Sequence, residues 1–204
     1  MNDLNRALVD ISSIRKQMAS TTEFRGYGPA TLAATGVFAV VAALMQRIWL
    51  ADPVHHVSAY LSLWVGTAAL SAVLTGVQMY TRSRRIHSAL SDEMIRMAVE
   101  QFLPSVGAGL LLTVVIVHYV PAVVWMLPGI WQVVFSLGIF SSCRFLPRPM
   151  IAAGAWYLLT GLGFIAMAGD AAFSPWAMGL PFGLGQLLVA AILLLGSSEN
   201  SDEA

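Results

Sequence analysis

The stretch SAYLSLWVGTAALSAVLTGVQMY (58–80) decides the fold of this chain, because it contains no charged residue and is long enough to cross a bilayer as a helix. A membrane-spanning helix needs about 20 apolar residues. Arginines follow at positions 82, 84 and 85, and a second apolar run extends from Ser105 to Val120. Short loops rich in Lys and Arg stay cytoplasmic. The chain is therefore expected to reach the cytoplasm near Arg82 and to re-enter the membrane near Phe102.

The composition of the whole chain is typical of a membrane protein with several spans. Of its 204 residues, 57 % are hydrophobic and 11 % are charged, and the net charge is zero. No large basic surface suggests a nucleic-acid partner. The single cysteine, Cys143, excludes an intrachain disulfide and a multi-cysteine metal site. Because residues 1–28 lack a signal-peptide pattern, we expect a compact protein of the cytoplasmic (inner) membrane.

Hydropathy predicts an all-α integral membrane protein with one domain of six transmembrane helices over residues 29–196. The spans are expected at about 29–50, 58–80, 105–120, 122–140, 150–168 and 176–196. Every Lys and Arg except Arg47 falls on the side that this arrangement makes cytoplasmic, so both termini are expected in the cytoplasm. The acidic residues 197–204 are expected to form a disordered tail.

The N-terminal segment 1–28 is expected to be cytoplasmic and to contain an amphipathic helix over residues 3–18. Leu4, Leu8, Ile11, Ile14 and Met18 recur at three- and four-residue steps. Leu8 and Ile11 lie at the centre of this apolar face and are candidate partner-binding residues. The helix is expected either to lie on the membrane surface or to dock on a partner, which is another protein or a second copy of the chain.

Ionisable residues inside a membrane usually mark functional sites, and none of the predicted spans has Asp, Glu, Lys or Arg near its middle. This argues against a proton pump, a voltage sensor and most charge-coupled transporters. Glu100 lies one turn after Arg96 on the same predicted helix face. Pro104 cannot donate a hydrogen bond to the backbone carbonyl of Glu100, which leaves that group open to another donor. The alternative for Glu100 is a surface carboxylate at headgroup level. The candidate functional or interfacial residues are Glu100, Arg96, His118, Arg82, Arg84 and Arg85.

Three histidines, His55, His56 and His118, are predicted near the non-cytoplasmic face. Their convergence would permit a haem or a divalent metal there. However, adjacent histidines point in different directions on a regular helix, and only Asp52 accompanies them. We therefore predict ordinary interfacial polar residues and no cofactor.

Small and amide-bearing residues within the spans predict how the helices pack. The runs GAGLLL (107–112) and GLGQLL (183–188) each follow a proline, Pro104 and Pro181. This pattern indicates either an inverted repeat of three plus three helices or close-packing positions at Gly107, Gly179 and Gly183. Three glutamines are expected to form hydrogen bonds between helices, namely Gln78, Gln132 and Gln186.

The sequence contains none of the common catalytic motifs, such as GxSxG, HExxH, a P-loop or a dinucleotide fingerprint. We therefore predict a protein that is not an enzyme, namely a membrane sensor, regulator or accessory subunit acting through helix contacts. The first alternative is a small permease for an apolar or weakly polar solute, with a path along helices interrupted at Pro104, Pro128 and Pro181. The second is a haem- or metal-binding redox subunit.

Overall fold

The computed structural model describes residues 28–50, 52–86, 89–143, 149–167 and 169–202. These residues form no strand. They form the helices α2 (Pro29–Trp49), α3 (Val57–Ile86), α4 (Ala89–Tyr119), α5 (Leu127–Ser142), α6 (Met150–Met167) and α7 (Pro175–Asp202), with short 3-10 helices η1 (Pro121–Met126) and η2 (Gly169–Phe173). Six helical stretches, the fourth made of η1 and α5 together, are long and apolar enough to span a membrane. The all-helical prediction and the number of span-length helices are confirmed, whereas the predicted N-terminal amphipathic helix lies outside the described residues.

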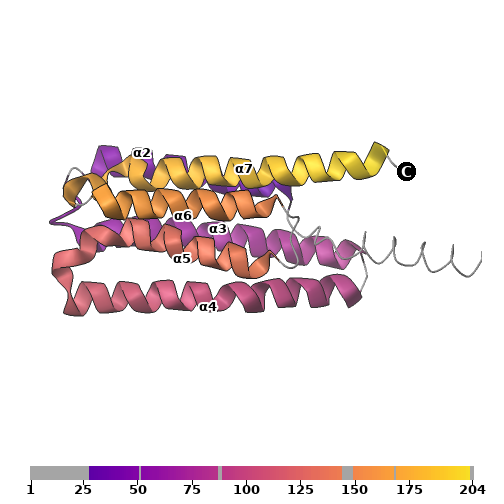
Figure 1. Cartoon of the computed structure of the whole chain (residues 1–204), viewed down its shortest axis with the longest axis horizontal. Coiled ribbons are helices and arrows are strands. Elements are labelled where there is room, and N and C mark those ends of the chain that lie inside the picture. Colours follow the sequence, from indigo (N-terminus) through magenta and orange to yellow (C-terminus); the bar gives the residue numbers. More distant parts are fainter. Residues whose placement is uncertain (1–27, 51, 87–88, 144–148, 168, 203–204) are drawn as a thin grey trace, which may run out of the picture.

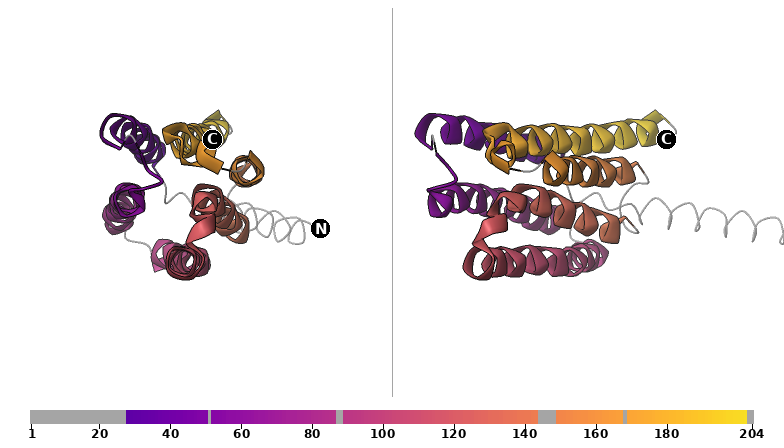
Figure 2. Two further views of the ribbon diagram at one scale, coloured as in Figure 1. Left: turned by 90° about the vertical axis from the view of Figure 1, so that its left-hand side faces the viewer. Right: turned by 60° about the vertical axis from the view of Figure 1, so that its left-hand side comes forward.

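The helices run up and down in chain order and form a ring, which α7 closes by packing on α2 (Figures 1 and 2). The α2–α3, α4–α5 and α6–α7 connections lie together at one end of the bundle, which we call the loop end. The start of α2 and the end of α7 lie at the opposite end, which we call the terminal end.

The contact between α2 and α7 is close because small residues meet there. A Cβ atom added to Gly179 would lie 2.5 Å from the Cβ of Ala43, and one added to Gly183 would lie 2.9 Å from the Cγ2 of Val40. Small residues at four-residue spacing let two helix backbones approach each other. Gly179 and Gly183 are thus confirmed as close-packing positions. Gly107 is not one, because a Cβ atom there would meet nothing within 4 Å.

A second close pair joins α5 to α6. A Cβ atom added to Gly129 would lie 2.6 Å from the carbonyl oxygen of Gly161, and one added to Gly161 would lie 2.7 Å from the carbonyl oxygen of Gly129. Gly154 of α6 is in turn covered by the ring of Phe140 from α5. The bundle is therefore built on two close pairs, which α3 and α4 complete to a ring.

The helices α3 and α4 are much less buried than the others. Only 11 % of the apolar window in α3 and 6 % of that in α4 is buried, against 44 % for the window formed by η1 and α5. At the loop end α3 is held by the buried Tyr60 and Trp64, and near the terminal end by the buried Met79. Large apolar side chains such as Val73 on α3 and Leu111 on α4 are 62 % and 69 % exposed.

Several helices extend beyond the predicted spans. The helix α3 continues to Ile86, so Arg82, Arg84 and Arg85 belong to its last turns rather than to a loop; cations suit that end of a helix dipole. The helix α4 begins at Ala89 and passes through Pro104. Residues 89–104 and the third span, predicted at about 105–120, thus belong to one helix.

The start of the fourth span and the end of the sixth also differ from the prediction. Residues Pro121–Met126 form the 3-10 helix η1, with Val123 outside helical geometry, and α5 starts only at Leu127. Pro128 lies in the first turn of α5, where its missing N–H group costs no helical hydrogen bond. At the other end of the chain, α7 continues to Asp202, where we predicted a disordered tail. Extending an existing helix adds one hydrogen bond for each residue that it fixes.

Candidate functional site

A buried glutamine organises the loop end. Gln46 is 1 % exposed, its Nε2 donates to the carbonyl oxygen of Phe173 at 2.7 Å, and its Oε1 accepts from the indole Nε1 of Trp64 at 2.8 Å. These bonds connect α2 to α3 and to η2. Our sequence analysis missed Gln46. The available signal was its spacing, because it continues the small-residue face of Gly36, Ala39 and Ala43 at three- and four-residue steps.

Aromatic rings close this end of the bundle around Tyr60. The ring of Tyr60 stacks on that of Trp131 at 6.4 Å and meets that of Phe173 edge-on at 5.1 Å. A second aromatic cluster lies deeper in the bundle, where the rings of Phe135 and Tyr157 are 4.8 Å apart. Such pairs add to the packing energy of the buried area.

Two cavities lie on either side of Ser174, the residue that precedes α7. The first, of about 410 Å³, is lined from the end of α2, the α2–α3 loop and the start of α7, and it contains both Arg47 and Asp52. The second, of about 540 Å³, lies between α6 and α7, and its lining is mostly apolar. Ser174 lines both cavities, so they adjoin each other at the loop end. We call the first the polar cavity and the second the lateral groove.

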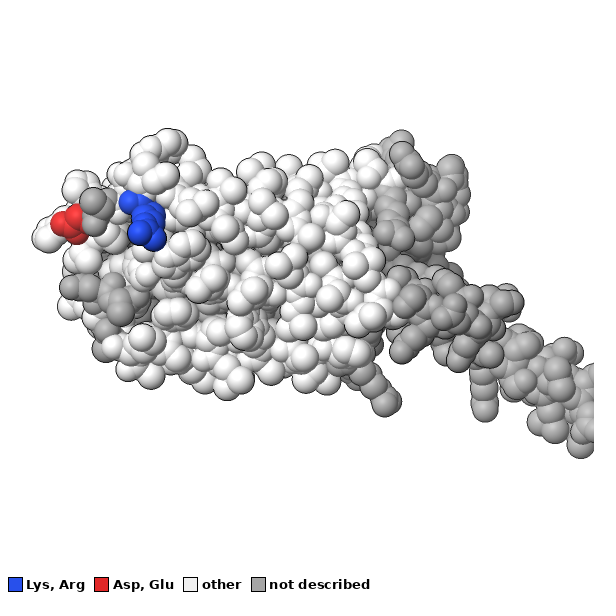
Figure 3. Space-filling view, turned by 90° about the horizontal axis from the view of Figure 1, so that it is seen from above, with Lys and Arg blue, Asp and Glu red and all other residues white. Residues whose placement is uncertain are grey.

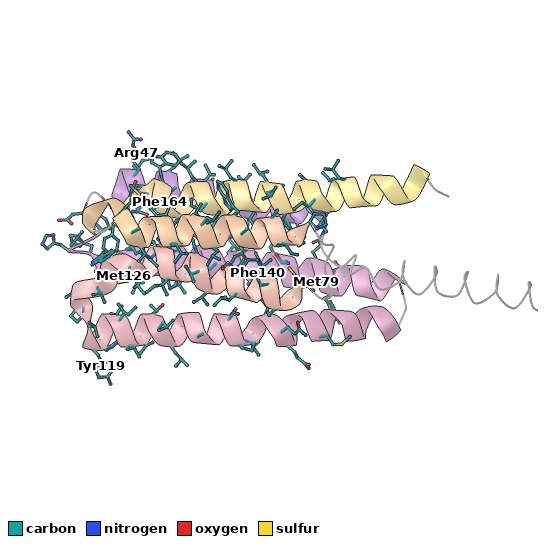
Figure 4. The ribbon with its side chains drawn as sticks, viewed as in Figure 1. Arg47, Met79, Tyr119, Met126, Phe140 and Phe164 are labelled. Carbon is teal, nitrogen blue, oxygen red and sulfur yellow. The ribbon has the colours of Figure 1, made fainter. Side chains whose placement is uncertain are left out.

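The two charged residues of the polar cavity differ in their contacts, because Asp52 is hydrogen-bonded to a neighbouring side chain and Arg47 points outward. The Asp52 carboxylate accepts a hydrogen bond of 2.6 Å from Nδ1 of His55, and this bond holds the pKa of Asp52 below its usual value. Arg47 belongs to the last turn of α2, and its side chain points away from the bundle (Figure 4). On the face seen in Figure 3, coloured side chains appear only near the loop end, and the rest of the described surface is uncharged.

Two backbone carbonyls around the proline of α7 accept hydrogen bonds from neighbouring helices. Pro181 lacks an N–H group and cannot bond the carbonyl of Ala177, four residues earlier. Nε2 of Gln132 donates to that carbonyl at 2.9 Å from α5, and the indole Nε1 of Trp156 donates to the carbonyl of Pro181 at 2.9 Å from α6. The prediction that Gln132 bonds between helices is confirmed.

The other two glutamines that were predicted to bond between helices, Gln78 and Gln186, differ in their hydrogen bonds. Oε1 of Gln78 accepts from the backbone N–H of Gly28 at 3.1 Å, which fastens the start of α2 to α3 and confirms its predicted role. The Oε1 atom of Gln186 has no hydrogen-bond partner among the described residues.

The three histidines form no common site. His55 bonds Asp52, and Nδ1 of His56 donates to the backbone carbonyl of Asp52 at 3.1 Å. The exposed His118 instead donates from Nδ1 to the carbonyl of Val114 on its own helix at 3.1 Å. Within the described ranges, no group of three His, Cys, Asp or Glu residues could hold a metal ion.

The remaining candidate residues are placed only in part. Glu100 is exposed on α4. Close to it, Ser141 of α5 donates to the carbonyl of Gln101 at 3.2 Å. The side chains of Arg82, Arg84, Arg85 and Arg96, and the whole of Leu8 and Ile11, lie outside the described residues.

Cys143 lies just after the end of α5, and burial raises the pKa of its thiol, which disfavours a reactive thiolate.

Comparison with known proteins finds no matching family model, no matching curated protein and no matching solved structure.

Proposed function

We propose that this chain is a multi-pass protein of the cytoplasmic membrane, with both termini in the cytoplasm, and that it binds another membrane protein through helix contacts of α3 and α4. In this role it is a sensor, regulator or accessory subunit rather than an enzyme. Insertion is supported by the span-length helices and by large apolar side chains exposed along them. Orientation is supported by the sequence, because every Lys and Arg except Arg47 falls in a segment that the order of the spans predicts to be cytoplasmic.

The observation that carries the proposed role is the unused packing surface of α3 and α4. Most glycines in α2, α5, α6 and α7 touch neighbouring helices, with Gly163 of α6 as an exception. A Cβ atom added to Gly66 or Gly76 of α3, or to Gly107 of α4, would meet nothing within 4 Å, although one added to Gly109 of α4 would lie 3.7 Å from Val134 of α5. Glycine in a membrane helix is a position where another backbone can approach closely. We infer that a helix of a partner packs on this surface.

The N-terminal helix over residues 3–18, with Leu8 and Ile11 on its apolar face, is a second proposed contact with the partner. In the proposed orientation it would lie on the cytoplasmic side of the membrane. Deleting residues 1–18 therefore tests a different part of the proposal from substitutions in α3.

The test is co-purification from native membranes. The double variant Gly66→Leu with Gly76→Leu fills the free surface of α3, and Gly163→Leu is the matched control, because Gly163 of α6 also has nothing within 4 Å of its Cβ position. We expect the wild type and the control to retain a partner that the double variant loses, while neither variant is less thermally stable than the wild type. Retention of the partner by the double variant would refute the role of α3.

A small permease is the second candidate, favoured by a row of hydroxyl groups on α3. Thr67, Ser71 and Thr75 are partly buried and continue the face of the buried Tyr60 and Trp64. Each hydroxyl donates to the carbonyl four residues earlier, at 2.8 to 2.9 Å. Such a face is only weakly polar, which suits an apolar or weakly polar solute. Uptake into proteoliposomes that Ser71→Phe blocks would support the permease over the regulator.

A further inference from the structure

We propose that the lateral groove between α6 and α7 holds one alkyl chain of a phospholipid, with the lipid phosphate at the loop end beside Arg47. The proposal rests on the membrane insertion put forward above, and it adds a ligand site that the partner surface of α3 and α4 does not use.

The groove has the lining and the size of a site for an alkyl chain. Its volume of about 540 Å³ falls in the range of small-molecule pockets. Trp156, Phe164 and Leu184 contribute apolar side chains to its lining. The rim residues Leu180 and Met167 are 48 % and 65 % exposed, so the groove is open toward the surroundings of the bundle. In a bilayer these surroundings are alkyl chains.

The length of the groove matches one leaflet. Its lining follows α7 from Ser174 to Leu184, which corresponds to about 15 Å at about 1.5 Å per residue. The hydrocarbon core of a bilayer is about 30 Å thick, so the groove extends from the loop end to about the middle of the membrane. A single chain anchored at the loop-end surface would fill it.

The headgroup end of the groove is where a cation is available. At Ser174 the groove adjoins the polar cavity, which Arg47 also lines. The acidic residue of that cavity, Asp52, is already engaged by His55 at 2.6 Å. A guanidinium group binds phosphate through two parallel hydrogen bonds. The alkyl chain and the phosphate would thus be bound in two adjoining cavities that share Ser174.

The groove is held open by structural contacts that a lipid would not disturb. The indole of Trp156 bonds the carbonyl of Pro181, and Gln132 satisfies the carbonyl of Ala177 from inside the bundle. The hydroxyl of Thr160 donates to the carbonyl of Trp156 at 2.9 Å. The indole of Trp156, the carbonyls of Ala177 and Pro181 and the hydroxyl of Thr160 are therefore satisfied without a ligand, and the lining of the groove is mostly apolar.

The test is native mass spectrometry of the full chain, purified in detergent, delipidated and then offered two lipids. Dioleoyl phosphatidylglycerol is the probe, and dioleoylglycerol carries the same chains without phosphate. We expect the wild type to retain one molecule of the phosphate lipid, and Thr160→Phe, which fills the groove, to lose it. Leu159→Phe is the matched control, because Leu159 is 69 % exposed on α6 and does not line the groove. Arg47→Gln should bind the phosphate lipid about tenfold more weakly and dioleoylglycerol unchanged.

Two results would overturn the proposal at different points. Equal retention of both lipids by the wild type and by Thr160→Phe would show non-specific association. Equal retention of the phosphate lipid by Arg47→Gln would remove the phosphate site. Alkaline carbonate extraction of the membranes separates these failures from a failure of the proposed insertion, because a protein that leaves the membrane refutes both proposals. The partner proposal is tested independently, since Thr160→Phe leaves α3 and α4 unchanged.

Discussion

Replacing Gln132 with leucine should destabilise the bundle only while Pro181 is present. Gln132 is fully buried, and its Nε2 atom supplies the hydrogen bond that Pro181 cannot give to the carbonyl of Ala177. Leaving a buried carbonyl unsatisfied costs about 1–3 kcal/mol, and hydrogen bonds between membrane helices contribute about 0.6 kcal/mol on average. Removing Oε1 of Gln132, which has no partner among the described residues, offsets part of this cost. We therefore expect Gln132→Leu to lower the free energy of unfolding by about 1 kcal/mol.

The double variant shows whether this reasoning is correct. Pro181→Ala restores an N–H group that can bond the carbonyl of Ala177, so Gln132→Leu should cost little or nothing in that background. The expected coupling energy is about 1 kcal/mol, measured by unfolding in mixed micelles with increasing dodecyl sulfate. Independent sites add within about 0.3–0.5 kcal/mol. The matched control is Gln78→Leu, because Gln78 bonds Gly28 and should be additive with Pro181→Ala. Coupling below about 0.5 kcal/mol for Gln132 would refute the proposed compensation.

Three further predictions concern packing, pH and orientation. Gly179→Ala should lower the free energy of unfolding by about 1–3 kcal/mol, because the added methyl group forces α2 away from α7. Gly66→Ala should raise the free energy of unfolding by about 0.5–1 kcal/mol, because a Cβ atom at Gly66 meets nothing and alanine favours the helix. Unfolding in micelles measures both values. The hydrogen bond from His55 lowers the pKa of Asp52 in the folded protein, so this contact should persist at neutral pH and be lost only as the pH falls through that lowered pKa. NMR of the His55 ring would follow the loss of the contact, and loss well above pH 4 would contradict the prediction. In a cysteine-free background, Asp52→Cys should react with an impermeant thiol reagent in intact cells and Asp202→Cys should not, and the reverse pattern would invert the proposed orientation.

The sequence predicted the helices well because their length and apolar content are local properties. A run such as 58–80 cannot satisfy its backbone inside a membrane except as a helix. The helix ends were harder to predict, because α3 and α7 continue past the ends of their apolar runs, and hydropathy reports the apolar run rather than the length of the helix. The irregular start of the fourth span places Pro121 in the first turn of η1 and Pro128 in the first turn of α5.

The lateral packing could not be predicted because it depends on which surfaces meet. Gly107 and Gly183 follow prolines in similar runs, yet Gly183 packs on α2 and Gly107 touches nothing within 4 Å. The importance of Gln46 depends on Trp64 and Phe173, which the chain brings to it only in the folded bundle. The two cavities likewise form where segments far apart in the sequence meet near Ser174, which no local pattern encodes.

Site-specific photo-crosslinking on α3 tests the proposed partner surface most directly. A photoreactive amino acid at Ala69, which is exposed on α3 between Gly66 and Gly76, should form one adduct of defined mass with another protein in native membranes. The same amino acid at Leu162, exposed on α6, should form none. Equal adducts at both positions, or adducts with lipid alone at Ala69, would contradict the proposal that α3 is the surface by which this protein binds its partner.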